Sequence, residues 1–253
     1  MTMTGMKTIT MSKSFITPDW PAPANVRALI TTRVGGVSTA PYASFNLGDH
    51  VGDDPQHVAQ NRANLTARLP AQPAWLTQVH GTTVLDAAAV SGAPQADASV
   101  ARQPGVVSVV MTADCLPVLL CDRTGTVVAA AHAGWRGLLD GVLECTVEAM
   151  AKPGAELLAY LGPAIGPTAF EVGDEVRQAF VAHDAYAAEA FVPSAHAGKW
   201  LADLYLLARQ RLQGVGVDAV YGGDDCTYSH AERFFSYRRD GITGRMASLI
   251  WLA

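Results

Sequence analysis

Two short apolar runs place the strongest constraint on how this chain folds. Val106 to Met111 and Val127 to Ala131 are rich in valine and alanine and are bounded by turn residues, a pattern typical of buried strands. Asp114 and Cys115 follow the first run, and His132 follows the second directly, before a segment where a helix begins. We therefore expect metal-capable side chains at the ends of two buried strands.

A third such residue, His80, lies beside a glycine at the end of another short apolar segment. Two imidazoles and one thiolate, from His80, His132 and Cys115, form a set with which Zn²⁺ keeps a fourth position for water or substrate. A zinc of this kind activates water or polarises a substrate oxygen. Because the ligand spacing matches no zinc-finger motif, the prediction of a catalytic zinc rests on strand ends that converge.

The same residues allow a second chemistry, in which Cys115 is a nucleophile and His132 or His80 is its base. Asp114 would then be an acid or base, or would orient a histidine. Copper is less favoured as the metal, because the chain has no HxH pair and no His or Met closely follows Cys115, as blue-copper sites require.

The composition is that of a globular protein and argues against several classes of partner. The 253 residues are 49% hydrophobic, which is enough for one large core. A net charge of −5 without a basic block argues against a nucleic-acid partner, and no apolar stretch reaches the roughly 18 to 20 residues that span a bilayer. The four cysteines show no paired spacing, and the start of the chain has no apolar region of the signal-peptide kind. Both observations predict reduced thiols in the cytoplasm.

Strand and helix patterns are mixed without a strict βαβ order, which predicts an α/β fold with a mixed sheet. We expect a loose N-terminal tail over residues 1–25 and a single catalytic domain over residues 26–253. Further strands are expected from Val26 to Thr32, Val215 to Tyr221 and Ala247 to Leu252. Helices are expected from Asp54 to about Pro70, from Leu138 to Met150, from Val172 to Phe180 and from Trp200 to Leu212.

Four polar side chains are predicted to contact a substrate. Arg33, which lies between a strand and a glycine pair, could bind an anion such as phosphate or form a surface ion pair. Arg62 could instead clamp a loop, and Asn46 could brace its own loop as an Asx turn. Arg238 and Arg239 are adjacent, so one is expected to point inward and the other to solvent.

Seven motifs together resemble the YfiH family, the laccase-domain-containing proteins, and they cover nearly the whole chain after Pro23. These motifs are Thr31 to Ser38, Asn46 to Gly48, Gln78 to Gly81, Ala113 to Pro117, Ala131 to Gly137, Gly162 to Gly166 and Ser236 to Arg239. The resemblance implies a single-domain layered sandwich with a mixed sheet, related to cysteine hydrolases. It also implies a zinc held by His80, Cys115 and His132.

Members of this family were once called polyphenol oxidases and are described as purine nucleoside enzymes. The resemblance therefore implies phosphorolysis of adenosine, inosine, guanosine and methylthioadenosine, with a nucleoside and phosphate as small-molecule partners, together with deamination of adenosine. Arginines such as Arg33 would hold the phosphate. Other bacterial members are linked to peptidoglycan editing, which implies as an alternative an amidase of a cell-wall precursor that uses Cys115. A non-catalytic zinc-binding module is a third interpretation.

Overall fold

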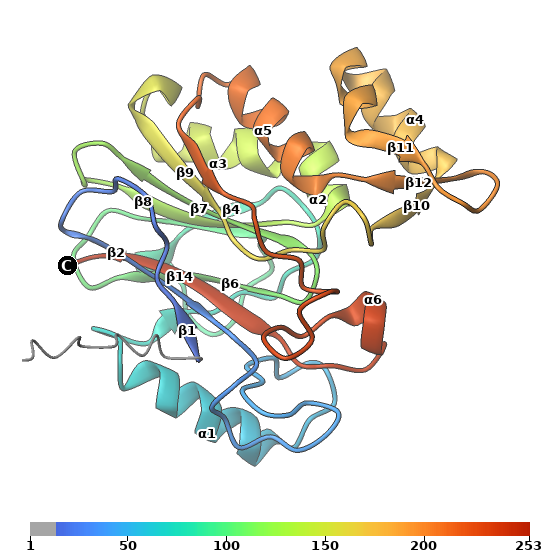
Figure 1. Ribbon diagram of the computed structural model, residues 1–253. Helices are drawn as coiled ribbons and strands as arrows, with labels where there is room; N and C mark the ends of the chain where they lie inside the picture. The colour runs from blue at the N-terminus through green and yellow to red at the C-terminus, as the bar shows by residue number, and fades with distance from the viewer. Residues whose placement is uncertain (1–13) are drawn as a thin grey trace, which may run out of the picture.

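Two β-sheets lie face to face at the centre of the molecule, as Figure 1 shows for residues 14–253, which the computed structural model describes. The first sheet has five strands in the order β1 (Phe15–Ile16), β2 (Val26–Thr31), β14 (Met246–Leu252), β6 (Val107–Thr112) and β3 (Pro73–Ala74). The second has six in the order β13 (Val220–Gly222), β9 (Leu157–Leu161), β7 (Leu116–Asp122), β8 (Val128–Ala133), β5 (Ala98–Ala101) and β4 (Val84–Asp86). Both sheets contain parallel and antiparallel pairs, so the predicted mixed α/β fold is confirmed.

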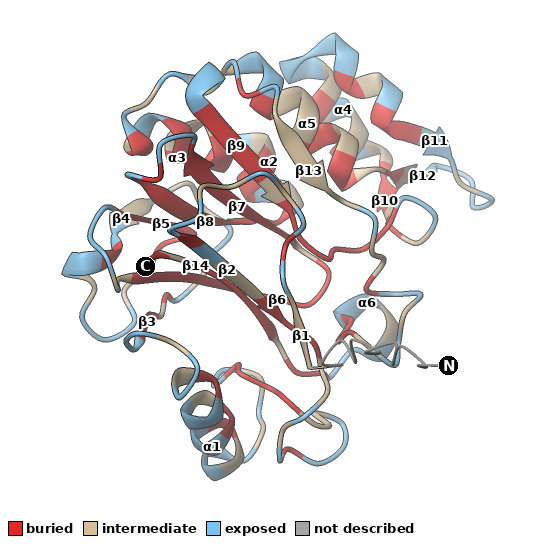
Figure 2. Ribbon diagram, turned by 60° about the vertical axis from the view of Figure 1, so that its left-hand side comes forward, coloured by how far each residue is buried: buried red, intermediate tan, exposed pale blue. Residues whose placement is uncertain are grey.

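Alternation along the strands divides the apolar side chains between two cores. On β8, Ala129 and Ala131 pack beneath the helices, whereas Val128 and Ala130 pack between the two sheets. Because successive side chains of a strand point to opposite faces, His132 shares the inter-sheet face of Val128 and Ala130. Every residue of β6, β7 and β8 is buried, and Figure 2 shows these strands in red at the centre. The candidate ligand His132 therefore projects from the most buried part of the fold.

Helices cover the outer faces of both sheets (Figures 1 and 2). The helices α2 (Trp135–Asp140), α3 (Val142–Met150) and α5 (Leu204–Gly214) lie over the six-stranded sheet. The helix α1 (Pro55–Thr66) lies on the far side of the five-stranded sheet, where Leu65 packs with Val109 and Leu249. The Asp54 carboxylate accepts a 2.8 Å hydrogen bond from the backbone N–H of Gln56, so the predicted helix start is confirmed. Four layers result, which is the expected layered sandwich.

A small third sheet corrects two of the helix predictions. It consists of β10 (Glu171–Gly173), β12 (Lys199–Ala202) and β11 (Phe191–Pro193), beside α4 (Asp174–His183). The segments from Val172 and from Trp200, expected to be helical throughout, both begin as strands and pair antiparallel with each other. The helix predictions were wrong at these positions because local periodicity does not report pairing between segments this far apart in the sequence. The remaining short elements are η1 (Ala87–Ala89), η2 (Gly154–Glu156), η3 (Ala185–Ala190) and α6 (Tyr237–Asp240).

Three other boundaries differ from the sequence prediction. The helix expected from Leu138 to Met150 is divided at Gly141, whose φ of 103° ends α2 before α3 begins. The strand expected from Val215 covers only Val220–Gly222. The tail expected over residues 1–25 is part of the fold from residue 15, because Phe15–Ile16 pairs with β2; its first 13 residues lie outside the described part of the chain. Within residues 14–253, no helix combines the length and apolar character needed to cross a membrane.

Candidate metal centre

His80, Cys115 and His132 come together at one end of the space between the sheets. Their ligand atoms all lie within 4.8 Å of one another, and no other group of this kind occurs among the His, Cys, Asp and Glu residues that the structure describes. His80 Nε2 is 3.7 Å from Cys115 Sγ, close to the roughly 3.5 Å that separates two ligands of a tetrahedral zinc. The three residues predicted from the sequence thus form a compact donor set.

Each ligand comes from a different segment of the fold. Cys115 lies in the crossover from β6 of one sheet to β7 of the other, and His132 lies near the end of β8, which pairs with β7. His80 lies in the loop between β3 and β4. Gly134 completes the arrangement, since a Cβ there would be 2.6 Å from His80 Cδ2 and 3.1 Å from Cys115 Sγ. A side chain at position 134 would therefore occupy the space between two ligands.

One carboxylate organises both histidines, and the sequence analysis missed it. Asp97 is fully buried, and its Oδ1 lies 2.8 Å from His132 Nδ1. The same side chain accepts hydrogen bonds from the backbone N–H groups of Val79, His80 and Gly81 at 3.1, 2.9 and 2.7 Å. Burial raises the pKa of Asp97, but these hydrogen bonds and the His132 ring outweigh it and lower the pKa. Asp97 therefore fixes the loop that carries His80 and leaves Nε2 of His132 for a metal.

The backbone is strained at the same place. His80 and Asp114 have φ values of 60° and 91°, and they are two of the three non-glycine residues with positive φ in the described chain. Such conformations are uncommon for residues with a side chain and persist where surrounding contacts hold them. The contacts to Asp97 hold His80, and those of the Asp114 carboxylate hold the turn before Cys115. Strain is thus concentrated in the segments that present two of the ligands.

The structure does not place Asp114 where a proton donor or a histidine partner would be needed. Its Oδ1 accepts a 2.6 Å hydrogen bond from Thr227 Oγ1, and its Oδ2 accepts a 2.7 Å bond from the backbone N–H of Arg238. Asp97, not Asp114, is the carboxylate beside His132. The geometry therefore does not support the expectation that Asp114 orients a histidine, because Oδ1 ties the crossover loop to Thr227 and Oδ2 ties it to the start of α6.

The three ligands shift one another's protonation. Burial raises the pKa of the Cys115 thiol, but the rings of His132 and His80 outweigh this and lower it. Burial lowers the pKa of His132, whereas the Cys115 thiolate and Asp97 raise it by a larger amount. A thiolate beside an imidazole is the form in which cysteine either binds a metal or acts as a nucleophile. Both interpretations of Cys115 remain compatible with this geometry.

A cavity of about 440 Å³ opens beside the triad. It is lined by His50, Leu76, Gln78, His80, Met111, Thr112, Ala113, Cys115, His132, Tyr237 and Arg245. Its volume is in the range that drug-sized ligands and cofactors occupy. None of these lining residues is Asp or Glu, so the side chains of the cavity are neutral or cationic apart from the Cys115 thiolate.

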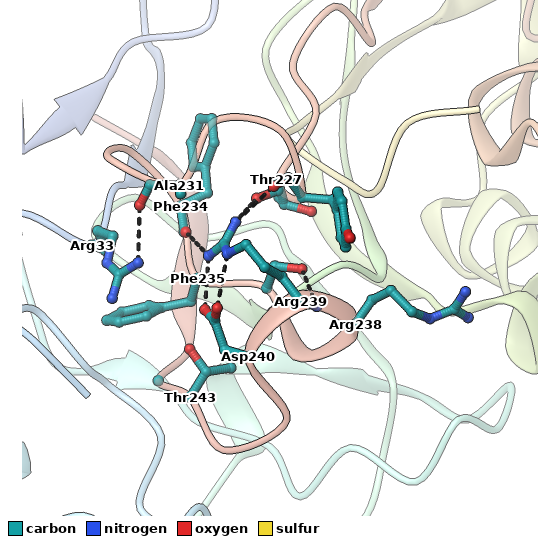
Figure 3. Close-up of polar contacts among 12 residues, drawn as sticks. Arg33, Thr227, Ala231, Phe234, Phe235, Arg238, Arg239, Asp240 and Thr243 are labelled. Carbon is teal, nitrogen blue, oxygen red and sulfur yellow. Dashed lines mark hydrogen bonds and ion pairs between the residues drawn. The ribbon is translucent and has the colours of Figure 1, made fainter. Parts of the chain in front are cut away.

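The predicted substrate contacts lie elsewhere or serve the fold, and none of them lines this cavity. Arg33 donates from Nε to the carbonyl of Ala43 and from Nη1 to that of Ala231. Arg62 donates to the carbonyl of Leu47, pairs with Asp49 at 3.2 Å and lies over the Trp75 ring; Asn46 is fully buried in its own loop. Arg238 donates to the carbonyl of Glu171. Figure 3 shows Arg33 turned toward a carbonyl, Arg239 bound to Asp240 and neighbouring carbonyls, and Arg238 directed away from both.

Arg245 is the arginine that does line the cavity, and the sequence analysis did not single it out. The only local signal was its position after Thr243-Gly244, a turn that precedes the last strand. Its backbone N–H donates to Oδ1 of Asn46 at 2.8 Å. Asn46 therefore acts on the cavity indirectly, by holding Arg245.

The donor set fits one metal ion with an open position. Two imidazoles and a thiolate are ligands of catalytic zinc sites and also of single copper ions. A multicopper site needs further clusters of ligands, and within residues 14–253 the triad is the only group of three or more metal-capable His, Cys, Asp and Glu side chains. The residues therefore fit a mononuclear centre and do not fit a multicopper one.

Comparisons with known proteins find relatives that match nearly the whole chain. A family model described as multi-copper polyphenol oxidoreductase laccase matches residues 27–253. A purine nucleoside phosphorylase of Pseudomonas aeruginosa is 62% identical over 239 residues, which cover 94% of this chain and 98% of that protein. The purine nucleoside phosphorylase YfiH of Escherichia coli is 59% identical over 248 residues, covering 96% of this chain and 100% of the relative.

Solved structures show the same architecture. A crystal structure of a Neisseria meningitidis protein matches with a TM-score of 0.92 and 58% identity, over 94% of this chain and 99% of that one. The structure of YlmD from Geobacillus stearothermophilus matches with a TM-score of 0.84 and 29% identity, over 96% and 97% of the two chains. From its matching family model, its relatives and its fold, this chain belongs to the YfiH family, whose model is described as a multi-copper polyphenol oxidoreductase laccase.

Proposed function

We propose that this protein is a zinc-dependent purine nucleoside phosphorylase that acts on adenosine, inosine, guanosine and methylthioadenosine. The observation that carries the proposal is a cavity of about 440 Å³ that has the triad on its wall and no carboxylate among its lining residues. Such a cavity suits a neutral nucleoside together with an anionic second substrate. The names of the relatives from Pseudomonas aeruginosa and Escherichia coli support the same activity.

His80, Cys115 and His132 would hold the zinc, which supplies Lewis-acid chemistry when bound by polarising an oxygen atom of a substrate. Asp97 keeps the His132 ring in one orientation and holds the loop that carries His80. In this proposal Cys115 and His132 act as ligands, so proton transfer falls to another residue. His50 is the one imidazole on the cavity wall outside the triad, and we assign to it the proton that the departing purine takes up.

Gln78 is tied to the end of β6 on the cavity wall. Gln78 donates from Nε2 to the carbonyl of Met111 at 2.8 Å and accepts from its N–H at 2.7 Å through Oε1. Both ends of this amide are used by the backbone of β6, so Gln78 shapes the cavity without a free group for a ligand. In phosphorolysis a phosphate oxygen bonds to the ribose carbon while that carbon's bond to the purine nitrogen breaks.

Deamination of adenosine belongs to the proposal as a second reaction, since three protein ligands leave room for water beside the metal. An amidase of a cell-wall precursor that uses Cys115 is the alternative.

The cytoplasm is the proposed location, because the four cysteines of the described chain are free thiols.

The test combines metal analysis with product analysis. Protein purified without added metal is examined by mass spectrometry, and adenosine turnover is followed by chromatography with and without phosphate. About one zinc per chain, with adenine and ribose 1-phosphate formed only when phosphate is present, is the expected result. Inosine as sole product would assign deamination instead. Zinc without nucleoside turnover would favour the amidase, and copper with phenol oxidation would overturn the zinc assignment.

A further inference from the structure

Among the described residues that line the cavity, Arg245 is the only arginine or lysine. Within residues 14–253 no carboxylate forms an ion pair with it, in contrast to Arg62, which pairs with Asp49, and Arg239, which pairs with Asp240. Burial lowers the pKa of Arg245, while the nearby Cys115 thiol and Asp114 carboxyl act in the opposite direction. The Arg245 side chain therefore lines the candidate site without an ion-pair partner in the described part of the chain.

Three contacts hold this side chain in place. Nη1 donates to the carbonyls of Thr243 and Gly244, each at 3.0 Å, and the backbone N–H donates to the buried amide oxygen of Asn46. The aliphatic stem packs on Gly48, where a Cβ would lie 2.8 Å from Arg245 Cγ. Nε and Nη2 donate to no residue of the described chain. Nη1 thus fixes the guanidinium, and the edge formed by Nε and Nη2 is free to bind a ligand.

Arg33 and Arg239 do not line the cavity. Arg33 and Arg239 direct their donors to backbone carbonyls, and Figure 3 shows both turned into the loops that they hold together. Nε and Nη1 of Arg33 donate to the carbonyls of Ala43 and Ala231, and Arg33 lies outside the cavity lining, so its position gives no support to the expected anion-binding role. Arg245, which lines the cavity with unbonded donors, is better placed than Arg33 to bind an anion.

We propose that Arg245 binds an oxyanion next to the triad, and that this oxyanion is inorganic phosphate, an assignment that rests on the proposed phosphorylase function. Nε and Nη2 form a planar pair of donors that matches two oxygens of one phosphate. A third phosphate oxygen is then free to attack the ribose carbon. A carboxylate has the same two-oxygen geometry, so a carboxylated cell-wall precursor is the other source of such an anion.

The test measures ligand binding separately from turnover. Binding of inorganic phosphate, and of acetate as a carboxylate probe, is measured by isothermal titration calorimetry on the zinc-loaded enzyme and on enzyme treated with a chelator. The variants are Arg245→Met, which removes the charge but keeps an aliphatic stem, and Gly48→Ala, which keeps the charge but displaces the stem. Arg27→Met is the matched control, because Arg27 is exposed on β2 and far from the cavity residues in the fold.

We expect Arg245→Met to weaken phosphate binding and to raise the KM for phosphate roughly 10- to 100-fold, the effect of losing a hydrogen-bonded charge. The dissociation constant for inosine without phosphate, the zinc content and the unfolding transition should stay unchanged. Gly48→Ala should shift phosphate binding in the same direction, and Arg27→Met should not. Unchanged phosphate binding in Arg245→Met would overturn the proposal, as would a loss confined to inosine binding.

The failure of this proposal is distinguishable from failure of the proposed function. If phosphate binds in an Arg245-dependent manner but no nucleoside is cleaved, the oxyanion site stands and the phosphorylase assignment fails. If phosphorolysis proceeds equally well in Arg245→Met, the activity stands and the role of Arg245 fails. Preferential binding of acetate over phosphate would assign the site to a carboxylated substrate and overturn the phosphate assignment.

Discussion

Asp97 Oδ1 lies 2.8 Å from His132 Nδ1, and the same oxygen accepts the backbone N–H of His80 at 2.9 Å. One buried carboxylate therefore orients two of the three candidate metal ligands. It acts on one through the ring and on the other through the main chain, so its loss affects two sides of the site at once.

Replacing Asp97 should weaken metal binding without removing a ligand. We expect Asp97→Asn to lower zinc affinity roughly 10- to 100-fold. The asparagine amide has one neutral oxygen that accepts hydrogen bonds, whereas both carboxylate oxygens of Asp97 accept them and carry negative charge. Competition with a chromogenic chelator measures the affinity. Asp86→Asn is the control, since Asp86 is an exposed residue whose carboxylate caps a short helix. Equal affinities for Asp97→Asn and wild type would show that Asp97 has no influence on the metal.

Removal of a single ligand tests the triad itself. His80→Ala, Cys115→Ser and His132→Ala should each reduce bound zinc from about one per chain to a small fraction, because two ligands hold zinc far more weakly than three. Elemental analysis after gel filtration measures the content. His50→Ala is the matched control for metal content, since His50 lines the cavity but is outside the triad. Full zinc content in Cys115→Ser would favour the nucleophile interpretation of Cys115.

The space at Gly134 gives a test that alters no polar group. In Gly134→Ala the added Cβ would lie 2.6 Å from His80 Cδ2, so the His80 ring must move and zinc affinity should fall at least tenfold. Circular dichroism should show an unchanged fold. Gly214→Ala is the control, because a Cβ at that position meets nothing within 4 Å. If Gly134→Ala bound zinc as tightly as wild type, the ligand arrangement described above would be wrong.

Asp114 is expected to matter for stability more than for the metal. Asp114→Asn replaces a charged acceptor of two hydrogen bonds and should lower the free energy of unfolding by about 1–3 kcal/mol. Asparagine tolerates positive φ well, so the turn before Cys115 should persist. Urea unfolding gives the stability, and chelator competition gives the zinc affinity, which should be retained. A large loss of zinc affinity with unchanged stability would restore a direct role for Asp114.

Asp122 sets a pH dependence of stability. This buried carboxylate at the β7–β8 turn accepts hydrogen bonds from Thr124, Thr126 and Val127. Burial raises the pKa of Asp122, but these hydrogen bonds outweigh that effect and lower the pKa well below the ordinary aspartate range. Since the folded state has the lower pKa, the stabilisation is complete above the unfolded value and is lost as the pH falls below it.

Asp122→Asn should therefore be less stable than wild type by about 1–3 kcal/mol at pH 7. The difference should shrink as the pH falls below about 4, the ordinary aspartate pKa. Urea unfolding at several pH values measures it. Asp218→Asn, at an exposed residue, controls for the loss of one charge. A difference that stays constant down to pH 2 would rule out the linkage to Asp122.

The sequence predicted those parts of the molecule that depend on local pattern. The strands β6 and β8 and the start of α1 follow from valine-rich runs and an Asp-Pro cap, and the triad follows from the ends of those runs. β7 was not predicted, because Pro117 and the preceding Asp-Cys pair interrupt its apolar run, although Pro117 pairs with His132 in the sheet.

The remainder depends on contacts between distant residues. A Cβ at Gly36 would lie 2.2 Å from the Ser44 carbonyl oxygen, so this glycine near Arg33 admits another segment of the chain. Arg245 reaches the cavity because Asn46, 199 residues away, holds its backbone. The sequence around Asp97 gives no sign of its role, because Asp97 meets His132 only through the pairing of β5 with β8.

The unequal burial of the three ligands determines how quickly an ion can be exchanged. His80 is exposed and lies on a loop, whereas His132 is buried in β8 and Cys115 is partly buried beside it. Release can begin with the opening of one loop, whose amides at His80 and Gly81 are bonded to Asp97, while the sheets remain closed. Two members of such a family with equal melting temperatures could therefore differ by orders of magnitude in the lifetime of their metal.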